Sequence, residues 1–225
     1  MKRIKHFLKK RIPGQLVIQF TNHCNARCPQ CGMRVTERFR RSKLMIDEVL
    51  QMIDAAVQKG VEAISFTGGE PLLFSDELAA MIRYAGDAGI KYIRTGTNGF
   101  IFMNANKPDF HTRISRIAEK LAQTPLRNFW ISIDSGVPSV HEEMRGLPGV
   151  IAGIEKGIPI FHEHGIYPSA NLGINRNVAG IPLFGKTDIR RRIKDDSERF
   201  YQEFRTAFRK FYNFVIDLGF TMVNS

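Results

Sequence analysis

Short apolar runs alternate with longer amphipathic stretches along most of the chain, and this alternation limits the folds that the sequence can adopt. The apolar runs predict strands at 15–20, 61–66, 91–98, 128–134, 167–174 and 220–224. The stretches between them carry apolar residues at helical spacing, which predicts helices at 45–60, 75–89, 111–123, 150–164 and 197–218. Strands that alternate with helices favour a parallel α/β fold. The alternation alone does not distinguish an open doubly wound sheet from a barrel.

A chain of 225 residues fits one domain. We expect a single core domain over 1–225, with a basic N-terminal extension at 1–14 and a long basic loop at 175–196. No apolar run approaches the roughly 20 residues of a membrane span. The N-terminus also lacks the apolar core of a secretory signal, so we expect a cytoplasmic protein.

The formal net charge is +11, and part of the excess is concentrated at 2–11, 34–43 and 190–194. Such charge favours an anionic partner, which could be a phosphorylated substrate, nucleic acid, an acidic protein or an anionic membrane surface. A solvated basic surface is the alternative. We expect the loop at 175–196 to lie near the site and to bind an anionic substrate, and the N-terminal segment is a candidate for the membrane contact.

The last predicted helix carries an aromatic stripe at near-helical spacing, which indicates a face buried in the core. The stripe consists of Phe200, Phe204, Phe208, Phe211 and Ile216.

The only cysteines of the chain, Cys24, Cys28 and Cys31, lie within eight residues of one another. An odd, tight group does not suit a disulfide framework and indicates metal or redox chemistry. A [4Fe–4S] cluster normally takes four cysteine ligands, so three would leave one iron open to a substrate or cofactor. A structural zinc ion with His23 as fourth ligand is a weaker alternative, because adjacent residues rarely reach the same ion. Three inert cysteines are a further alternative.

The other conspicuous motifs also follow predicted strands, at the ends where parallel α/β folds gather their chemistry. The sequence "GGEP" follows the second strand, "TNG" the third, and "SIDSG" lies on the fourth. Gly68 and Gly69 would let the backbone approach a ligand closely, and Glu70 would accept a hydrogen bond from a ligand ammonium. Further candidate residues for binding are Thr97, Asn98, Ser132, Asp134, Arg145 and Asn171.

The sequence "CNARCPQC" followed by "TGGEP" resembles the radical S-adenosylmethionine (SAM) superfamily, and the resemblance covers nearly the whole chain. "ISIDSGVPSVHEEMRGLPG" is similar to a stretch in the MoaA/PqqE-like group of that superfamily. The resemblance implies a partial (β/α)6 barrel. It also implies that Cys24, Cys28 and Cys31 hold a [4Fe–4S] cluster, whose fourth iron binds SAM. Reductive cleavage of SAM would then give methionine and a 5′-deoxyadenosyl radical, which abstracts hydrogen from a substrate.

The residue types and their places on the predicted strands suggest roles for the remaining candidates that agree with this resemblance. Ser132 would contact the ribose or carboxylate of SAM, Arg145 would pair with its carboxylate, and Asn171 would reach the ribose or adenine. An ordinary ion pair for Arg145 and a satisfied core amide for Asn171 are the structural alternatives. The family usually has an aromatic residue before the third cysteine, where Gln30 stands here. Gln30 would hydrogen-bond the adenine edge instead.

No cysteine follows Cys31, so this chain cannot hold an auxiliary cluster of the SPASM or twitch type by cysteine ligation. Ser65 stands where the molybdenum-cofactor enzyme has a substrate-binding arginine. We therefore expect a radical SAM enzyme that acts on an unidentified, anionic substrate and takes electrons from a flavodoxin- or ferredoxin-type donor. An activase that installs a glycyl radical on a partner protein is the main alternative. A basic nucleic-acid-binding protein with structural zinc is a remote one.

Overall fold

The computed structural model describes residues 14–29, 31–32, 40–172 and 196–224. Its strands are β1 (Gln15–Thr21), β2 (Ala63–Gly68), β3 (Tyr92–Thr97), β4 (Leu126–Ser132), β5 (Ser169–Asn171) and β6 (Met222–Asn224). Its helices are α3 (Ile46–Gln58), α4 (Ser75–Asp87), α5 (Phe110–Ala122), α6 (Pro138–Arg145), α7 (Val150–Glu163) and α9 (Ser197–Asp217). Two 3-10 helices, η2 (Pro71–Phe74) and η3 (Phe100–Phe102), follow β2 and β3.

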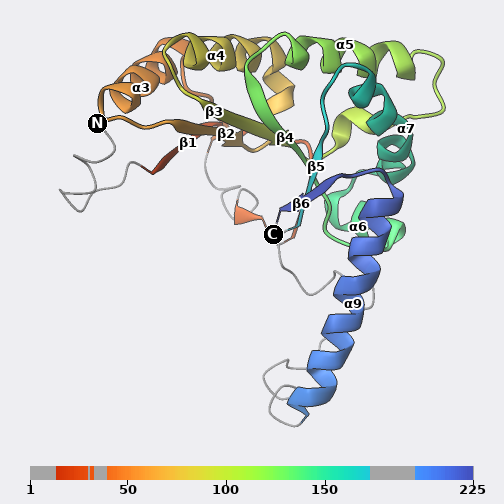
Figure 1. Cartoon of the computed structure of the whole chain (residues 1–225). Helices are drawn as coiled ribbons and strands as arrows, with labels where there is room; N and C mark the ends of the chain where they lie inside the picture. Colours follow the sequence, from red (N-terminus) through yellow and green to blue (C-terminus); the bar gives the residue numbers. More distant parts are fainter. Residues whose placement is uncertain (1–13, 30, 33–39, 173–195, 225) are drawn as a thin grey trace.

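The six strands form one parallel sheet in the order β1-β2-β3-β4-β5-β6. Helices α3, α4, α5 and α7 cover one face of this sheet, and the opposite face is concave (Figure 1). A doubly wound sheet would reverse its strand order and carry helices on both faces. The sequential order with helices outside is that of a partial barrel, and β1 and β6 remain its two edges among the described residues.

The hydrophobic core lies between the sheet and the helical layer. Alternate strand residues point outward into it, as Ile64 and Phe66 of β2 and Phe129 of β4 do, and all three are buried. The helices meet them with apolar stripes such as Val49 and Ile53 of α3, which are fully buried. Because the outward positions supply the core, the inward positions of the strands are available for polar side chains.

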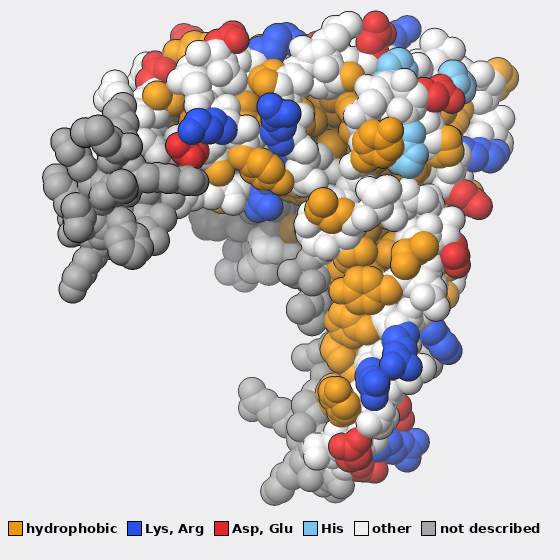
Figure 2. Space-filling view, viewed as in Figure 1, with side chains coloured by type: hydrophobic (Ala, Val, Ile, Leu, Met, Phe, Trp, Pro, Cys, Tyr) orange, Lys and Arg blue, Asp and Glu red, His pale blue; other side chains and the backbone are white. Residues whose placement is uncertain are grey.

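Among the described residues, helix α9 packs on the barrel mainly through its C-terminal half, and its first turns project away from the sheet (Figure 1). Hydrophobic side chains follow the projecting part (Figure 2). The predicted core stripe is correct for Phe211, which is fully buried, while Phe204 and Phe208 are partly buried. It is wrong for Ile216, which is 61% exposed, because the turn of the helix buries Val215 instead.

The predicted strands and main helices agree with the structure to within a few residues at their ends. The structure adds α6, η2 and η3, which the sequence analysis did not predict. Nearly all of the expected extension at 1–14 and of the basic loop at 175–196, and also Gln30, lie outside the described residues. Within the described part of the chain, no helix combines the length and apolar character needed to cross a membrane.

Candidate active site at the carboxyl ends of β1 to β4

The cysteine loop leaves the end of β1 and is held by backbone hydrogen bonds from two other elements. Gly69 N–H donates to the Thr21 carbonyl and Glu70 N–H to the His23 carbonyl, both at 2.8 Å. On the other side, Arg27 N–H donates to the carbonyl of Arg145 at the end of α6, also at 2.8 Å. These bonds fix the loop between the end of β2 and the end of α6.

The two glycines after β2 are required by this close contact. A Cβ atom at Gly68 would lie 2.4 Å from the Thr21 carbonyl oxygen, and one at Gly69 would lie 2.1 Å from that of His23. Both distances are far below van der Waals contact, so no larger side chain fits at either position without moving the loop. The close approach that the structure shows is therefore to the cysteine loop, and approach to a ligand stays a prediction.

Glu70 is fully buried and joins the end of β2 to the end of β3. Its Oε1 accepts from Leu72 N–H at 3.0 Å, and its Oε2 accepts from Asn98 N–H at 2.6 Å. Burial raises the pKa of this carboxyl from 4.5 to about 7, although the hydrogen bonds act in the opposite direction. The carboxylate thus orders the protein backbone around the site, and the predicted bond to a ligand ammonium is not tested by this geometry.

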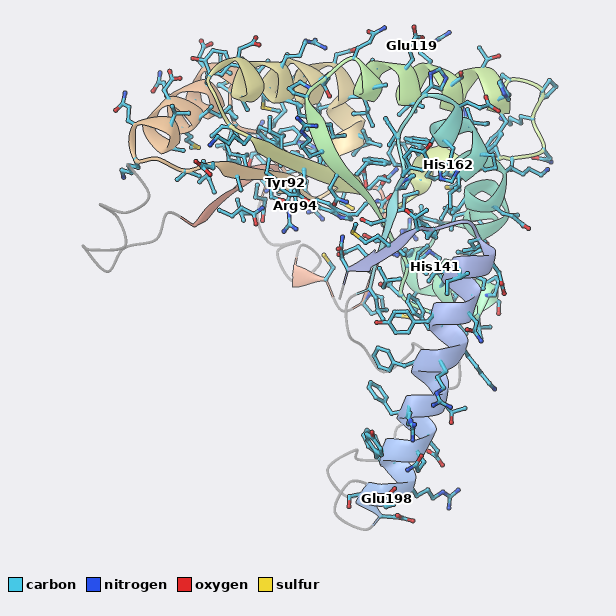
Figure 3. All side chains as sticks on the ribbon, in the orientation of Figure 1. Tyr92, Arg94, Glu119, His141, His162 and Glu198 are labelled. Atoms are coloured by element: carbon cyan, nitrogen blue, oxygen red, sulfur yellow. The ribbon has the colours of Figure 1, made fainter. Side chains whose placement is uncertain are left out.

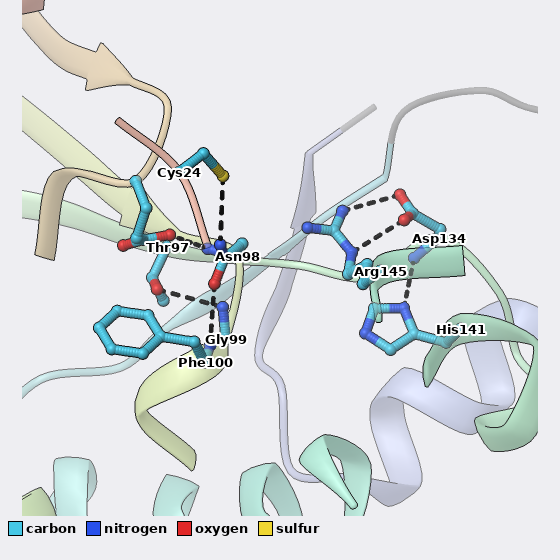
Figure 4. Close-up of polar contacts among 9 residues, drawn as sticks. Cys24, Thr97, Asn98, Gly99, Phe100, Asp134, His141 and Arg145 are labelled. Carbon is cyan, nitrogen blue, oxygen red and sulfur yellow. Dashed lines mark hydrogen bonds and ion pairs between the residues drawn. The ribbon is translucent and has the colours of Figure 1, made fainter. Parts of the chain in front are cut away.

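The end of β3 continues the network toward the cysteines (Figure 4). The Asn98 Nδ2 group donates to Asn25 Oδ1 at 2.9 Å and lies 3.7 Å from the Cys24 sulfur. Its Oδ1 accepts from Phe100 N–H at 2.9 Å. Thr97 Oγ1 accepts from Gly99 N–H at 3.1 Å. Asn98 therefore ties the third strand end to the cysteine loop and offers an N–H donor to a cysteine sulfur.

A buried ion pair closes the opposite side of the site. Arg145 Nε lies 2.8 Å from Asp134 Oδ2, and Arg145 Nη2 donates to Asp134 Oδ1 at 2.9 Å. His141 Nδ1 accepts from Asp134 N–H at 3.1 Å (Figure 4). Burial lowers the pKa of His141 from 6.5 to about 4, so this ring is neutral. The structure thus shows the ion pair considered for Arg145, while its contact with SAM remains a prediction.

Most of the predicted site residues line one pocket of about 220 Å3 at this end of the barrel. They are Cys24, Cys28, Cys31, Gly68, Gly69, Glu70, Thr97, Asn98, Ser132 and Arg145. Asp134 does not line the pocket, but it forms the ion pair that holds the lining residue Arg145. Asn171 at the end of β5 does not line the pocket, and Gln30 is not among the described residues.

Trp130 and Gly96 also line the pocket, and the sequence analysis did not select them. No motif marks either residue. The signal that was available is their position, since each occupies the inward register of a strand whose end carries a predicted motif. Trp130 and Gly96 face each other in the β3–β4 ladder.

Comparison with known proteins identifies the family to which this chain belongs. The family model of the radical SAM superfamily matches residues 18–195. The chain belongs to the radical SAM superfamily.

Relatives and a solved structure agree with this membership. An AdoMet-dependent heme synthase of Oleidesulfovibrio alaskensis is 26% identical over 74% of this chain and 39% of its own length. A GTP 3′,8-cyclase of Alkaliphilus oremlandii is 29% identical over 69% of this chain and 46% of its own. SuiB of Streptococcus suis, solved with S-adenosylmethionine bound, shares the fold with a TM-score of 0.54 and 21% identity over 76% of this chain and 37% of its own. This radical SAM chain thus spans less than half the length of these proteins.

The predicted family, the partial barrel and the cofactor set of a [4Fe–4S] cluster with SAM are confirmed for this radical SAM protein. The cysteines fit such a cluster. All three are free thiols that are partly exposed in the pocket. Among the described residues, no three His, Cys, Asp or Glu side chains converge on a single metal ion. A cubane places each thiolate on a different iron, so its three cysteines need not meet at one point as the ligands of a zinc ion do.

One positive charge lies near Cys28, while Asp134 and the two other cysteines act in the opposite direction. Burial raises the pKa of the Cys28 thiol, and the nearby Arg145 guanidinium acts against this increase. His23, the residue considered as a zinc ligand, instead packs its ring against Phe74 at a centroid distance of 5.7 Å. The site therefore offers three candidate cysteine ligands, a buried cation beside one of them and an amide donor beside another.

Proposed function

We propose that this radical SAM chain cleaves SAM reductively and removes a hydrogen atom from an anionic substrate. The observation that carries the proposal is the convergence of Cys24, Cys28 and Cys31 with the glycine–glutamate turn after β2 in one pocket. When bound there, the cluster and SAM supply a 5′-deoxyadenosyl radical. The substrate class, the electron donor and the overall reaction are parts of the proposal.

The protein residues around the pocket have three tasks in this reaction. The Asn98 amide and the Arg145 guanidinium stabilise the negative charge of the cysteine sulfurs. Glu70 and the hydrogen bonds of the cysteine loop keep the strand ends together, so the ligands do not need to reorganise. Ser132 lines the pocket and carries a hydroxyl group that a polar cofactor could use as a hydrogen-bond partner, while the Thr97 hydroxyl accepts from Gly99 N–H and so supports the turn after β3.

The electron donor that we propose is a flavodoxin- or ferredoxin-type protein. The reaction needs a strong reductant, because iron–sulfur potentials extend down to roughly −700 mV. Two exposed arginines lie at this end of the chain: Arg27 within the cysteine loop, and Arg40, whose carbonyl accepts from Asn22 at the start of that loop. A basic surface beside the cluster favours docking of an acidic donor, and the rate of reduction should then fall with increasing salt.

Anaerobic reconstitution with iron and sulfide tests the proposal. We expect about four irons and four sulfides per chain, and 5′-deoxyadenosine on addition of dithionite and SAM. Replacing Cys24, Cys28 or Cys31 by alanine should abolish the product. One zinc per chain, or a reconstituted cluster that yields no 5′-deoxyadenosine, would contradict the proposal. A glycyl radical on a coexpressed partner would identify the substrate as a protein and favour the activase alternative.

A further inference from the structure

The concave face of the sheet carries one charged side chain next to the active-site pocket. Ser65 of β2, Arg94 of β3 and Asn128 of β4 are neighbours in the parallel register. Arg94 points away from the helices, into the concave side of the sheet (Figure 3). Tyr92, two residues earlier on the same face, is 46% exposed, so this part of the face is open among the described residues.

Trp130 connects this position to the active-site pocket. A Cβ atom at Gly96 would lie 2.3 Å from the Nε1 and Cε2 atoms of the indole, so the ring lies directly on the Gly96 backbone. Both residues line the pocket together with the three cysteines. The Arg94 guanidinium carbon lies 5.6 Å from the centroid of the same indole. The indole thus borders the cofactor pocket and Arg94 at once.

Arg94 is held in place without being neutralised. Its Nε donates to Ser65 Oγ at 3.3 Å, and the indole contact restricts the rest of the group. Among the described residues, no carboxylate forms an ion pair with it. An arginine presents two terminal N–H₂ groups in a planar fork that matches a carboxylate or a phosphate. A fixed guanidinium with an open fork is suited to bind such a group.

We propose that Arg94 binds the anionic group of the substrate, with Trp130 as the wall shared with the cofactor pocket. This inference rests on the proposed function, since it places the substrate beside the radical. Arg94 lies two residues before Gly96 along β3, which is about 7 Å at 3.3 Å per residue. The substrate is therefore a molecule whose carboxylate or phosphate lies at Arg94 while its reacting carbon reaches the cofactor pocket beside the indole.

The single tryptophan of the chain makes this site directly observable. Protein labelled with 5-fluorotryptophan and reconstituted with its cluster gives one 19F signal, which reports on Trp130. We expect a saturable shift of this signal on titration with inorganic phosphate, with propionate or with both, and the two titrations separate a phosphate site from a carboxylate site. Arg94→Gln should weaken the apparent affinity about ten- to a hundredfold, the usual loss when a hydrogen bond to a charged group is removed.

The matched control is Arg127→Gln, which removes one positive charge from an exposed position on β4. It should titrate like the parent protein. Arg94→Lys should bind more weakly than the parent but better than Arg94→Gln, because it keeps the charge and loses the fork. No saturable shift with either anion, or an equal shift in Arg94→Gln, would overturn the proposal.

Formation of 5′-deoxyadenosine from SAM and dithionite is measured on the same samples. Failure of this reaction in the parent protein would count against the proposed function, whereas loss of the anion response alone would count only against the Arg94 site.

Discussion

At the scale of single residues, two buried titratable groups oppose each other in their effect on stability. The pKa of Glu70 is raised to about 7 in the folded protein. The folded state therefore binds this proton more tightly than the unfolded chain, and the stability that it contributes is lost as the pH rises from about 4.5 through 7. The pKa of His141 is lowered to about 4, so its contribution is lost as the pH falls from about 6.5 through 4.

Replacing Glu70 or His141 should reveal how the remaining group alone makes the free energy of unfolding depend on pH. One titrating group changes the free energy of unfolding by up to about 1.4 kcal/mol per pH unit. Between about pH 5 and 6.5 the two slopes have opposite signs, so we expect a nearly flat profile in the parent protein. Glu70→Gln should lose stability as the pH falls, by about 1 kcal/mol per unit. His141→Asn should lose a similar amount as the pH rises.

Urea unfolding under anaerobic conditions at several pH values measures these slopes. The test is the change in the free energy of unfolding with pH in each variant, and it does not depend on the absolute stability of that variant. If both variants keep the pH profile of the parent protein, the assignment of the buried proton to Glu70 and of the neutral ring to His141 is wrong.

At the scale of elements, the turn after β2 and the cysteine loop must fit each other before a cluster can be held. Gly69→Ala would place a methyl group 2.1 Å from the His23 carbonyl oxygen and 2.9 Å from Cys24 Cβ. We expect a loss of about 1–3 kcal/mol in the free energy of unfolding, as for overpacking elsewhere. The iron and sulfide content after reconstitution should also fall, because the loop that carries Cys24 has to move.

Gly32→Ala is the matched control, because Gly32 follows Cys31 in the same loop and a Cβ atom there meets nothing within 4 Å. This variant should reconstitute like the parent protein. Equal iron content in both alanine variants would show that the loop accommodates the methyl group and that the contact at Gly69 does not control cluster binding.

Several features of these elements could be predicted from the sequence, and others could not. The cysteines, the glycine–glutamate turn and Asn98 carry side chains whose chemistry is visible in a motif. Helix α6 was missed, although Pro138 at its first turn and Gly146 after its end, with φ of 65°, are recognisable boundary signals. The helix has only eight residues, and it lies inside the stretch that the sequence analysis used as a family motif and did not examine for helical spacing. Arg94 and Trp130 belong to no motif, and their significance depends on the strand register that brings them together.

At the scale of the whole molecule, the strand order brings motifs that are distant in the sequence together in one site. The alternation of strands and helices did not distinguish a doubly wound sheet from a barrel, because the strands and helices of both folds carry the same pattern of buried apolar residues. The sequential order brings four motif-bearing strand ends to one edge, and the single helical layer leaves the opposite face free for polar residues. The same order places α9, which precedes β6, against the loop that follows β4.

That packing couples α9 to the active site through Phe211. This side chain is fully buried, and its backbone lies 3.1 Å from where a Cβ atom of Gly136 would stand. Gly136 lies two residues after Asp134, which holds Arg145 in the ion pair beside the cysteines. Phe211→Ala should therefore cost about 3–5 kcal/mol of stability, as for other buried aromatic residues. It should also slow the formation of 5′-deoxyadenosine, because a helix that shifts into the vacated space moves its backbone away from Gly136 in the Asp134 loop.

Tyr201→Ala in the projecting first turns of the same helix is the control, since Tyr201 is 56% exposed. Its effect should stay within about 0.5 kcal/mol, with an unchanged rate of SAM cleavage. Urea unfolding and product formation, measured well below the melting temperature of each variant, separate the two effects. If Phe211→Ala unfolds more easily but cleaves SAM at the parent rate while folded, α9 stabilises the barrel without positioning Arg145, and the coupling inferred from Gly136 is wrong.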